Sequence, residues 1–574
     1  MRLVGEIAPA VLVSHLGYNA RASKQALLAT TPSAAPVSAR LVREDGWTRQ
    51  LRPAGAQHVA GWSATVYHPL RFDDVTEPGE YRVEAVVGGR VLSSTAFRIG
   101  EHVRQGSAVA DITAYFRSAR SSGEIDRKDR RARFYGDDSG REVDAHGGWL
   151  DASGDYSKFL SHLTYTRMMS PQQTPLVAWA LAQAGAELPA VHPGFRTSQH
   201  ARLRDEALHG ADFLMRFRSP DGYFYTGIFD ALTKVLEERV ITAPLQDSVR
   251  TQRWQAAYRH GGGMAIAALA RAATLDQAGE FGPEEYWTAA VRGFEHLERH
   301  NTKYLFDGRE SIIDEYCALM AATELVRAGR RRRADVVAFE QAARARVRAL
   351  TARRRFDDDG VGYLVGDATG APFFHAAEPG LPVIALIVAA EQLPDTAPQA
   401  RGLASALLAD LARRTDAVPN PFGYPRQRVQ PIGGEARDAF FYPHENETGY
   451  WWQGENAGLA SLAYAATLGA RLDEVSPELR ERLLRLADDV LGWVGGLNPF
   501  DSCMLQGKGR NNPDYSSEYQ NSPGGIANGI TSGFHDEDAI ALLPDDAPDG
   551  EQWRWAEQWI PHSGWYVLAV CAAR

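Results

Sequence analysis

The hydrophobic pattern of this chain changes its period near residue 105, and that change divides the molecule in two. Before it, short apolar runs are separated by Gly- and Pro-containing turns, and residues 81–87 alternate between apolar and polar side chains. Gly88-Gly89 then leads into Val91-Leu92, which is the pattern of a two-residue hairpin. Several short strands within about 95 residues predict a β-sandwich of immunoglobulin type over residues 1–102.

After residue 105 the period becomes 3.6, which is typical of amphipathic helices. Helical stripes lie at roughly 173–186, 200–217, 255–274, 284–300, 311–328, 334–350, 380–393, 399–414, 452–469, 476–493 and 553–572. Ala-rich helices joined by loops of uneven length predict stacked helical hairpins. About a dozen helices can close a ring of six hairpins, so we expect an (α/α)6 barrel over residues 103–574.

Three long segments interrupt the helical pattern, at residues 135–172, 415–450 and 498–552. They contain Gly, Pro, Asn, aromatic residues and carboxylates. Long loops without secondary structure are uncommon in compact domains and are often functional. Because each segment carries Trp, Tyr, Asp or Glu, we expect the three to form the walls of one cleft.

The composition excludes several classes of protein. The 574 residues carry a formal net charge of −10, whereas a general nucleic-acid binder needs a basic face. No stretch reaches the roughly 18 consecutive apolar residues of a membrane helix. Three cysteines are too few for a disulfide framework or a Cys-rich zinc site. We therefore expect no nucleic-acid or membrane partner, and either a monomer or a homodimer.

The first residues bear on the cellular compartment. Glu6 places a carboxylate inside the only candidate apolar stretch, and Ser14-His15 ends that stretch early. A secretory signal needs about 7–15 uninterrupted apolar residues before its cleavage site. We therefore expect a cytoplasmic protein, with a secreted protein whose signal is absent from this sequence as the alternative.

The first candidate for chemistry is a pair of aspartates in the segment 146–156. Asp151 and Asp155 are four residues apart and are separated by small residues, so a turn can direct both carboxylates to one point. Paired carboxylates of this kind can orient and deprotonate a water molecule. The alternative interpretation is a polar turn in which the aspartates cap backbone N–H groups.

The second candidate is Glu557, which lies among four tryptophans of the segment 553–565. An aromatic wall raises the pKa of a carboxyl group because the charged form loses its hydration. A general acid that works near neutral pH needs such a raised pKa. The alternative is a surface Glu on an amphipathic helix.

Together the two features predict a glycosidase. One carboxylic acid protonates the leaving oxygen while a carboxylate on the opposite side activates water, with about 6.5–9.5 Å between them in inverting enzymes. The chain also has 13 Trp, 21 Tyr and 22 Phe, and aromatic faces stack on the apolar faces of sugars. The candidate substrate-binding residues are Trp149, Tyr156, His260, Tyr450, Trp451, Trp452, Glu518, Trp555 and Trp559.

Short motifs occur along nearly the whole chain, and their order is informative about the family. They are residues 11–19, 147–155 (GGWLDASGD), 312–315, 321–325, 450–456 (YWWQGEN), 496–499 (GLNP), 522–525 (SPGG) and 557–560 (EQWI). In this order they resemble glycoside hydrolase family 9, a cellulase-type family with an immunoglobulin-like N-terminal domain and an (α/α)6 barrel. The resemblance implies that Asp155 is the general base, that Asp151 helps to hold the water, and that Glu557 is the general acid.

The sequence departs from the family pattern in two places that bear on function. An extra residue, Ser153, stands inside the aspartate motif. The His-His-Arg stretch of the cellulases is absent, and residues 511–519 stand in its place. Because that stretch contacts substrate in the cellulases, we expect a substrate other than plain cellulose.

Calcium sites also occur in the family, and Asp536, Glu537 and Asp538 are the residues that could bind a structural calcium ion through hard oxygens. A solvated acidic loop is the alternative. We expect no cofactor to be required for the chemistry.

The resulting hypothesis is inverting hydrolysis of β-glycosidic bonds in gluco-configured oligosaccharides, of the exo type, on imported substrates. Three alternatives remain open from the sequence. They are an endo-acting β-1,4-glucanase, a polysaccharide lyase with a Tyr or His base, and a non-catalytic carbohydrate-binding relative.

Overall fold

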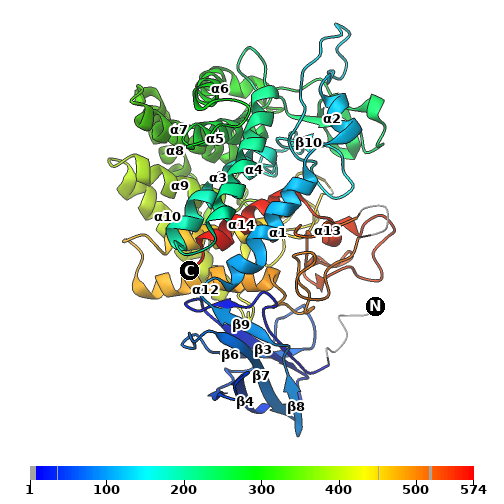
Figure 1. The fold of residues 1–574 in the computed structure, drawn as a ribbon, viewed down its shortest axis with the longest axis vertical. Helices are drawn as coiled ribbons and strands as arrows, with labels where there is room; N and C mark the ends of the chain where they lie inside the picture. Colours follow the sequence, from blue (N-terminus) through cyan, green and yellow to red (C-terminus); the bar gives the residue numbers. More distant parts are fainter. Residues whose placement is uncertain (1–7, 35, 450, 516–519) are drawn as a thin grey trace.

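The computed structural model describes residues 8–34, 36–449, 451–515 and 520–574. A β-rich domain at one end of the molecule carries a larger helical domain (Figure 1). Tyr450 and Glu518, two of the predicted substrate-binding residues, lie outside the described residues. In the described part of the chain, no helix is both long and apolar enough to cross a membrane.

The N-terminal domain is a sandwich of two sheets. Its strands are β1 (Ala10–Leu12), β2 (Tyr18–Asn19), β3 (Gln25–Thr30), β4 (Pro36–Arg43), β5 (Thr48–Leu51), β6 (Val66–Arg71), β7 (Gly79–Val87), β8 (Arg90–Ser93) and β9 (Phe97–Gly100). One sheet has the order β1-β3-β6 and the other β2-β9-β7-β4-β5, with β8 paired to β7. Alternate side chains of β7 are buried because neighbouring residues of a strand point to opposite faces.

The predicted hairpin is confirmed. Val87 pairs with Arg90, so Gly88 and Gly89 form the two-residue turn between β7 and β8. Their φ angles are +57° and +76°, a left-handed conformation that the twist of a two-residue hairpin requires and that glycine adopts without strain.

The second domain is mainly helical. Its helices are α1 (Val103–Ala119), α2 (Gly123–Asp129), α3 (Thr174–Val191), α4 (Thr197–Arg216), α5 (Gly262–Ala272), α6 (Pro283–Tyr304), α7 (Ile312–Arg332), α8 (Val337–Ala352), α9 (Leu381–Gln392), α10 (Ala397–Asp416), α11 (Asn456–Gly469), α12 (Pro477–Val494), α13 (Trp553–Ala556) and α14 (Ile560–Ala572). Short 3-10 turns lie at η1 (Leu236–Glu238), η2 (Gln246–Ser248) and η3 (Tyr258–His260).

Short strands lie in the loops between the helices. They are β10 (Lys158–Phe159), β11 (Gly227–Phe229), β12 (Val240–Ile241), β13 (Ala243–Pro244), β14 (Arg250–Thr251), β15 (Arg354–Phe356), β16 (Gly362–Leu364), β17 (Gln427–Val429), β18 (Arg437–Ala439), β19 (Thr531–Ser532) and β20 (Ile540–Ala541). Apart from the three-stranded sheet β10-β11-β12, they pair as isolated two-stranded ribbons.

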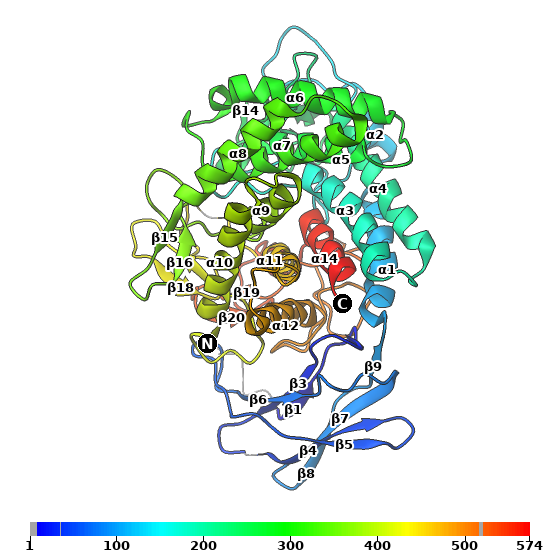
Figure 2. The same cartoon turned by 90° about the vertical axis from the view of Figure 1, so that its left-hand side faces the viewer.

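Among the described residues, the helices form two concentric layers, and the predicted (α/α)6 barrel is confirmed (Figure 2). The inner layer is a closed ring of α3, α5, α7, α9, α11 and α14, in which each helix packs against the next and α14 packs against α3. Each inner helix is backed by an outer one: α4 on α3, α6 on α5, α8 on α7, α10 on α9, α12 on α11, and α1 on α14.

Burial explains which helices lie inside. Every residue of α11 is buried, and residues 381–390 of α9 are buried as well, because both segments are apolar on all sides. The outer helices α6 and α12 bury only one face and carry charged residues on the other.

The predicted stripes correspond to the barrel helices, with three differences. The stripe 255–274 begins as the helix α5 only at Gly262, and the stripe 452–469 begins as α11 only at Asn456. The last stripe, 553–572, is broken into α13 and α14, with Glu557 in extended conformation between them. The helices α1 and α2 were not predicted.

An aromatic interface joins the two domains. Trp62 of the sandwich packs against Phe422, Phe440 and Trp493 of the barrel, with ring centroids 6.1, 4.8 and 5.9 Å apart. The buried Arg104 at the start of α1 forms an ion pair with Asp488 of α12, the helix that also carries Trp493. The last strand of the sandwich ends at Gly100 and α1 begins at Val103, so the passage between domains is only two residues long.

Candidate active site

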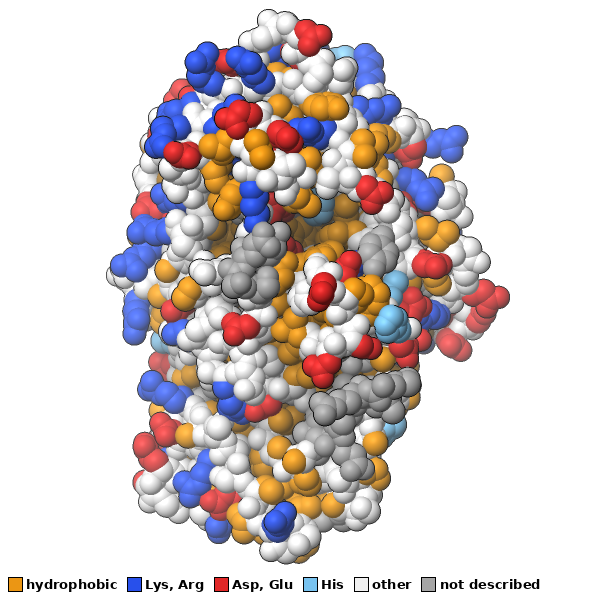
Figure 3. All heavy atoms as spheres, turned by 90° about the vertical axis from the view of Figure 1, so that its right-hand side faces the viewer, with side chains coloured by type: hydrophobic (Ala, Val, Ile, Leu, Met, Phe, Trp, Pro, Cys, Tyr) orange, Lys and Arg blue, Asp and Glu red, His pale blue; other side chains and the backbone are white. Residues whose placement is uncertain are grey.

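A cavity of about 620 Å³ opens in the helical domain. Hydrophobic side chains gather in a hollow on this side of the molecule (Figure 3). Segments of four loops line the cavity, at residues 151–165, 229–248, 448–453 and 550–559, together with Tyr515. The lining includes Asp151, Asp155 and Glu557, so the structure brings together the three carboxyl groups singled out in the sequence.

The two aspartates lie on a tight turn. The N–H of Asp151 donates to the carbonyl of Ser157 (2.9 Å), and the N–H of Asp155 donates to the carbonyl of Ala152 (3.2 Å). Gly154 has a φ of +74°, which allows the chain to reverse between the two carboxylates. The N–H of Ser157 donates to Oδ1 of Asp155 at 2.8 Å and fixes that side chain.

A buried ionic cluster holds the turn that carries Asp151 and Asp155. Lys158 Nζ lies 2.7 Å from a carboxylate oxygen of Asp129, and Arg239 Nε lies 2.7 Å from the other. Arg239 also donates to the carbonyl oxygen of Tyr156, next to the base candidate. All three charged side chains are at most 1% exposed. The cluster connects the turn to α2, which carries Asp129, and to the loop that carries Arg239. Removing one partner would leave an uncompensated buried charge, so these connections are costly to break.

Glu557 is held at the break between α13 and α14. The N–H of Asn528 donates to the carbonyl of Glu557 at 2.7 Å, and the N–H of Glu557 donates to the carbonyl of Trp553 at 3.2 Å. Pro561 at the second position of α14 has no N–H to satisfy, which suits the first turn of a helix. The backbone on both sides of the acid candidate is therefore fixed by neighbouring loops.

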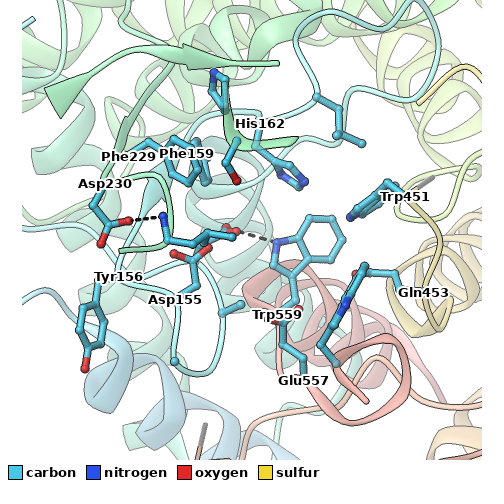
Figure 4. A pocket seen from close by; sticks show the side chains of 18 of the residues that line it. Asp155, Tyr156, Phe159, His162, Phe229, Asp230, Trp451, Gln453, Glu557 and Trp559 are labelled. Carbon is cyan, nitrogen blue, oxygen red and sulfur yellow. Dashed lines mark hydrogen bonds between the residues drawn. The ribbon is translucent and has the colours of Figure 1, made fainter. Parts of the chain in front are cut away.

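The aspartate turn pairs directly with the Glu557 segment. Ala152 and Trp559 form an antiparallel bridge, in which the N–H of Ser153 donates to the carbonyl of Gln558 at 2.8 Å and the N–H of Ile560 donates to the carbonyl of Asp151 at 3.1 Å. The indole N–H of Trp559 donates to Oδ1 of Asp151 at 3.2 Å. In Figure 4 the indole of Trp559 lies among Asp155, Glu557, His162 and Trp451.

The surroundings separate the acid–base properties of the three groups. Burial raises the pKa of Asp155, but the hydrogen bond from Ser157 opposes that effect. Burial, and then the charge of Asp155, raise the pKa of Glu557 well above its usual range. Burial and the charges of Asp155 and Glu557 also raise the pKa of Asp151 well above its usual range. Asp155 therefore loses its proton first, while Glu557 keeps its own at higher pH.

The six Trp and Tyr candidates that the structure describes divide into two groups. Tyr156, Trp451 and Trp559 line the cavity, where they can contact a ligand. The other three do not: Trp149, Trp452 and Trp555 are buried and do not line the cavity.

Trp149 is fully buried and packs against Gly210, and its indole N–H donates to Glu206 at 3.3 Å. Trp452 is covered by His444, whose ring is stacked at 3.8 Å, and Trp555 packs edge-on against Trp452 at 5.7 Å. The substrate-binding roles predicted for these tryptophans do not agree with their positions in the core.

His260 is also buried, at 1% exposure, and does not line the cavity. It ends the 3-10 turn η3, and the next residue, Gly261, lies so close to Leu160 that a side chain there would clash. Its predicted contact with substrate does not agree with this position either.

Comparison with known proteins settles the family. Residues 106–519 match the description "Glycosyl hydrolase family 9", and residues 6–89 match "Cellulase N-terminal ig-like domain". The chain belongs to glycosyl hydrolase family 9. The matched range carries both aspartates of the turn and ends before Glu557.

Two solved structures share the fold of this family 9 protein. A structure described as "Bacteroides ovatus GH9" is 16% identical, with a TM-score of 0.62 over 98% of both chains. A Zn-binding triple mutant of the GH family 9 endoglucanase J30 is 18% identical, with a TM-score of 0.63 over 97% of this chain and 99% of the other. Among curated proteins, none matches the sequence.

The acidic segment suggested for calcium does not fit a cation in this family 9 chain. Arg437 lies 2.6 Å from Glu537 and 2.7 Å from Asp538, and Asp536 accepts a hydrogen bond from the N–H of Asp538. A guanidinium that pairs with two of three carboxylates occupies the oxygens that calcium would need. Within the described residues, no group of three or more His, Cys, Asp or Glu side chains is arranged to hold a metal ion.

One wall of the family 9 cavity comes from a segment that no sequence motif indicates. Asp230, Leu232, Lys234 and the segment 244–248 line it. Of the described residues in the predicted loops 415–450 and 498–552, only Thr448, Tyr515 and Gly550 line the cavity. Residues 217–261, between α4 and α5, contain no α-helix. A helix-free stretch of this length is the sequence feature that indicates a cavity-lining loop. The predicted helical stripe 255–274 overlaps its last residues, so the loop appears shorter in the sequence than it is.

Two further lining residues were also missed. His162 lies seven residues after Asp155, and Gln453 follows the tryptophan pair 451–452. No local pattern in the sequence marks either residue, because polar and apolar side chains both surround them.

Proposed function

We propose that this family 9 glycosidase hydrolyses β-glycosidic bonds in gluco-configured oligosaccharides with inversion, with Asp155 as the general base and Glu557 as the general acid. The observation that carries the proposal is that Asp155 and Glu557 line one cavity with different surroundings. Asp155 has a local N–H donor that favours its charged form, and Glu557 is buried beside that charge. A base that is ionised while its partner is still protonated is the state that inverting hydrolysis needs.

In the proposed step, the proton of Glu557 passes to the glycosidic oxygen as the bond between that oxygen and the anomeric carbon breaks. A water molecule attacks the opposite face of the anomeric carbon and gives a proton to Asp155. Asp151, whose Oδ1 is held by the indole of Trp559, helps to position this water. The products are a sugar of inverted anomeric configuration and a free hydroxyl group on the leaving part, and solvent then returns a proton to Glu557 and takes one from Asp155.

The cavity supports an exo-type action. Its volume of about 620 Å³ lies in the range of pockets that enclose small ligands, and loops from several sides line it. Trp451 and Trp559 offer aromatic faces on which the apolar face of a sugar can stack. A pocket of this kind accepts the end of a chain, so we propose that short oligosaccharides are trimmed from one end.

The anomeric configuration of the first product tests the mechanism. Hydrolysis of aryl β-glycosides and β-linked oligosaccharides is followed by proton NMR before mutarotation, and the α-anomer is expected to appear first. A β-anomer as first product overturns the inverting mechanism. Product sizes at early times test the mode: single sugars or disaccharides support the exo proposal, and a ladder of oligomers supports endo action. Glu557→Gln serves as the blank for contaminating activity.

A further inference from the structure

A short chain of hydrogen bonds connects the wall of the cavity to Asp151. Nδ1 of His162 lies 3.0 Å from Oε1 of Gln173, and Nε2 of Gln173 donates to Oδ1 of Asp151. Gln173 directly precedes α3, and its backbone N–H donates to the carbonyl of Leu160 at 3.0 Å. The amide of Gln173 is therefore held at the end of an inner helix between an aspartate and a histidine.

The polarity of this chain can be worked out from the aspartate. Oδ1 of Asp151 already accepts the indole N–H of Trp559, which can only donate. In the structure the amide nitrogen of Gln173 is directed at the same oxygen, so Oδ1 of Asp151 accepts both N–H groups. The amide oxygen must then face His162, and it requires a donor there. Nδ1 of His162 carries the hydrogen, and the lone pair lies on Nε2.

The surroundings keep His162 in this neutral form. Burial lowers the pKa of His162 to about 4. Its ring lies against Trp451 and Trp559, with ring centroids 5.6 and 6.1 Å apart, and against Phe159 at 5.5 Å. Within the part of the chain that the structure describes, Nε2 of His162 has no hydrogen-bond partner, and the side chain lines the cavity (Figure 4).

We infer that Nε2 of His162 is a specificity-determining acceptor, which takes a hydrogen bond from a hydroxyl or amine group of the sugar in the cavity. Gln173 is the positioning residue that fixes the tautomer through Asp151. The inference rests on the proposed function because it places a sugar in this cavity. It adds that one position of the ring must carry a donor, so a sugar with hydrogen or fluorine at that position is rejected.

The consequence for selectivity follows from the chemistry of an unpaired acceptor. A substrate without the donor leaves Nε2 facing an apolar neighbour after water has been expelled, and sites built for a hydrogen bond reject such analogues strongly. Fluorine is decisive here because it retains the size of a hydroxyl group and cannot donate. Deoxy and deoxyfluoro analogues should therefore fail at the same position.

The test uses the p-nitrophenyl β-glycoside that the full-length protein hydrolyses best, with its monodeoxy and deoxyfluoro derivatives. Dissociation constants of the matching methyl β-glycosides are measured alongside by calorimetry, because they do not depend on the reactivity of the glycosidic bond. For the wild type we expect a 10- to 100-fold loss of affinity and of kcat/KM at one ring position, for both derivatives. Equal affinity at every position overturns the inference, and so does a fluoro derivative that binds as well as the parent sugar.

Two variants separate the roles of the ring nitrogens. His162→Asn keeps a donor near the position of Nδ1 and removes Nε2, so we expect weaker binding of the parent sugar and no further loss with the deoxy sugar. Discrimination that survives unchanged in His162→Asn contradicts the inference. His162→Gln keeps a polar group near Nε2 and should restore part of the affinity. His200→Asn on the outer helix α4 is the matched control and should behave as wild type, and thermal melting shows that each variant is folded.

The failure of the proposed function gives a different pattern. If the wild type hydrolyses no glycoside but binds methyl glycosides, the calorimetric comparison of wild type and His162→Asn decides the inference without turnover. If the wild type binds none of the sugars, both the proposed function and the inference are overturned.

Discussion

Ser153 and Gln558 are joined by two hydrogen bonds that cross from the base turn to the acid segment. The N–H of Ser153 donates to the carbonyl of Gln558, and the N–H of Gln558 donates to Oγ of Ser153, both at 2.8 Å. Oγ of Ser153 also donates to Asn521 at 3.0 Å. Ser153 is the residue by which the aspartate motif departs from the family pattern. The insertion therefore connects the loop of Asp155 to the neighbour of Glu557.

Loss of this connection should affect turnover more than stability. Ser153→Ala leaves the N–H of Gln558 without its acceptor, at a cost of about 1–3 kcal/mol for an unpaired buried group. If the acid segment moves to recover that cost, kcat falls about 10-fold while the melting temperature changes little. Steady-state kinetics and thermal melting measure the two effects. Ser139→Ala in an exposed loop is the control, and unchanged kcat in Ser153→Ala contradicts the structural role.

The acid and base roles can be separated by the leaving group. Glu557→Gln and Asp155→Asn should each lower kcat by about 10²–10⁴-fold on an oligosaccharide. A dinitrophenyl leaving group departs without protonation, so it should restore much of the activity of Glu557→Gln and none of that of Asp155→Asn. The reverse pattern assigns the roles the other way round. Melting temperatures are expected to stay the same or rise, because each change removes a buried carboxyl group.

The pH optimum of kcat/KM should lie higher than the ordinary pKa values of two carboxyl groups would give. Asp155 acts when ionised, so activity rises as the pH passes its raised pKa. Glu557 acts when protonated, so activity falls as the pH passes its pKa, which lies well above the usual range. We expect a bell-shaped profile in wild type and the loss of its alkaline limb in Glu557→Gln with a dinitrophenyl substrate. An optimum near pH 4 speaks against these environments.

Two carboxyl groups outside the cavity should make stability fall with rising pH. Burial raises the pKa of Glu378 and of Glu455 from 4.5 to about 8. Between these values the folded state keeps the proton that the unfolded state has lost. The contribution of each group to the free energy of unfolding is therefore fully present below about pH 4.5. Between about pH 4.5 and 8 it decreases by about 1.4 kcal/mol per pH unit, and above about pH 8 it is lost.

Glu378→Gln isolates one of these contributions. The Glu378 carboxyl group accepts the hydroxyl of Tyr316 at 2.6 Å and the N–H of Gln172 at 2.9 Å, and an amide can donate to the first and accept from the second. Denaturant unfolding at several pH values between 5 and 7.5 should show a slope smaller than that of wild type by about 1.4 kcal/mol per pH unit. Glu481→Gln on the exposed face of α12 should leave the slope as it is. Equal slopes in Glu378→Gln and wild type reject the raised pKa.

Asp230 should control the wall of the cavity that the sequence did not reveal. Its carboxylate accepts the N–H groups of Leu232 (3.0 Å) and Lys234 (2.9 Å), in a loop where Ala231, Leu232 and Lys234 all have positive φ angles. Non-glycine residues in this conformation need surrounding structure to hold them. Asp230→Ala should raise KM about 10-fold with little change in melting temperature. Asp137→Ala, which removes a similar loop cap away from the cavity, is the control, and equal KM values in the two variants disprove the assignment.

Much of this architecture could be predicted because its signals are local. The period of two, the Gly88-Gly89 turn and the 3.6-residue stripes depend on near neighbours in the sequence. The helix α1 carried such a signal as well, since Ala108, Ile112 and Phe116 recur at helical spacing. Its first buried residues, Arg104 and Gln105, are polar and contact residues far away in the sequence, which local periodicity does not reveal.

The identity of the residues that face the cavity was less accessible. Trp451 and Trp452 are adjacent in sequence, yet one lines the cavity and the other lies beneath His444. The sequence does not distinguish the two, because the path of the backbone decides which tryptophan side chain faces the cavity. Asp151, Asp155 and Glu557 stand out through the order of motifs that resembles the family, since each segment alone also fits a capping turn or a surface helix.

The closure of the inner ring has a consequence for biosynthesis. Helix α14 fills the gap between α11 and α3, and it is backed by α1, the first helix of the barrel. During translation, α1 and the base turn leave the ribosome more than 400 residues before α14 and the segment that carries Glu557. A nascent chain can therefore fold its sandwich and stack its early hairpins, but it gains its acid only when the last helix closes the ring. A chain that stops short of α14 has an open inner ring, and the proposed catalytic pair comes together only after α14 has been made.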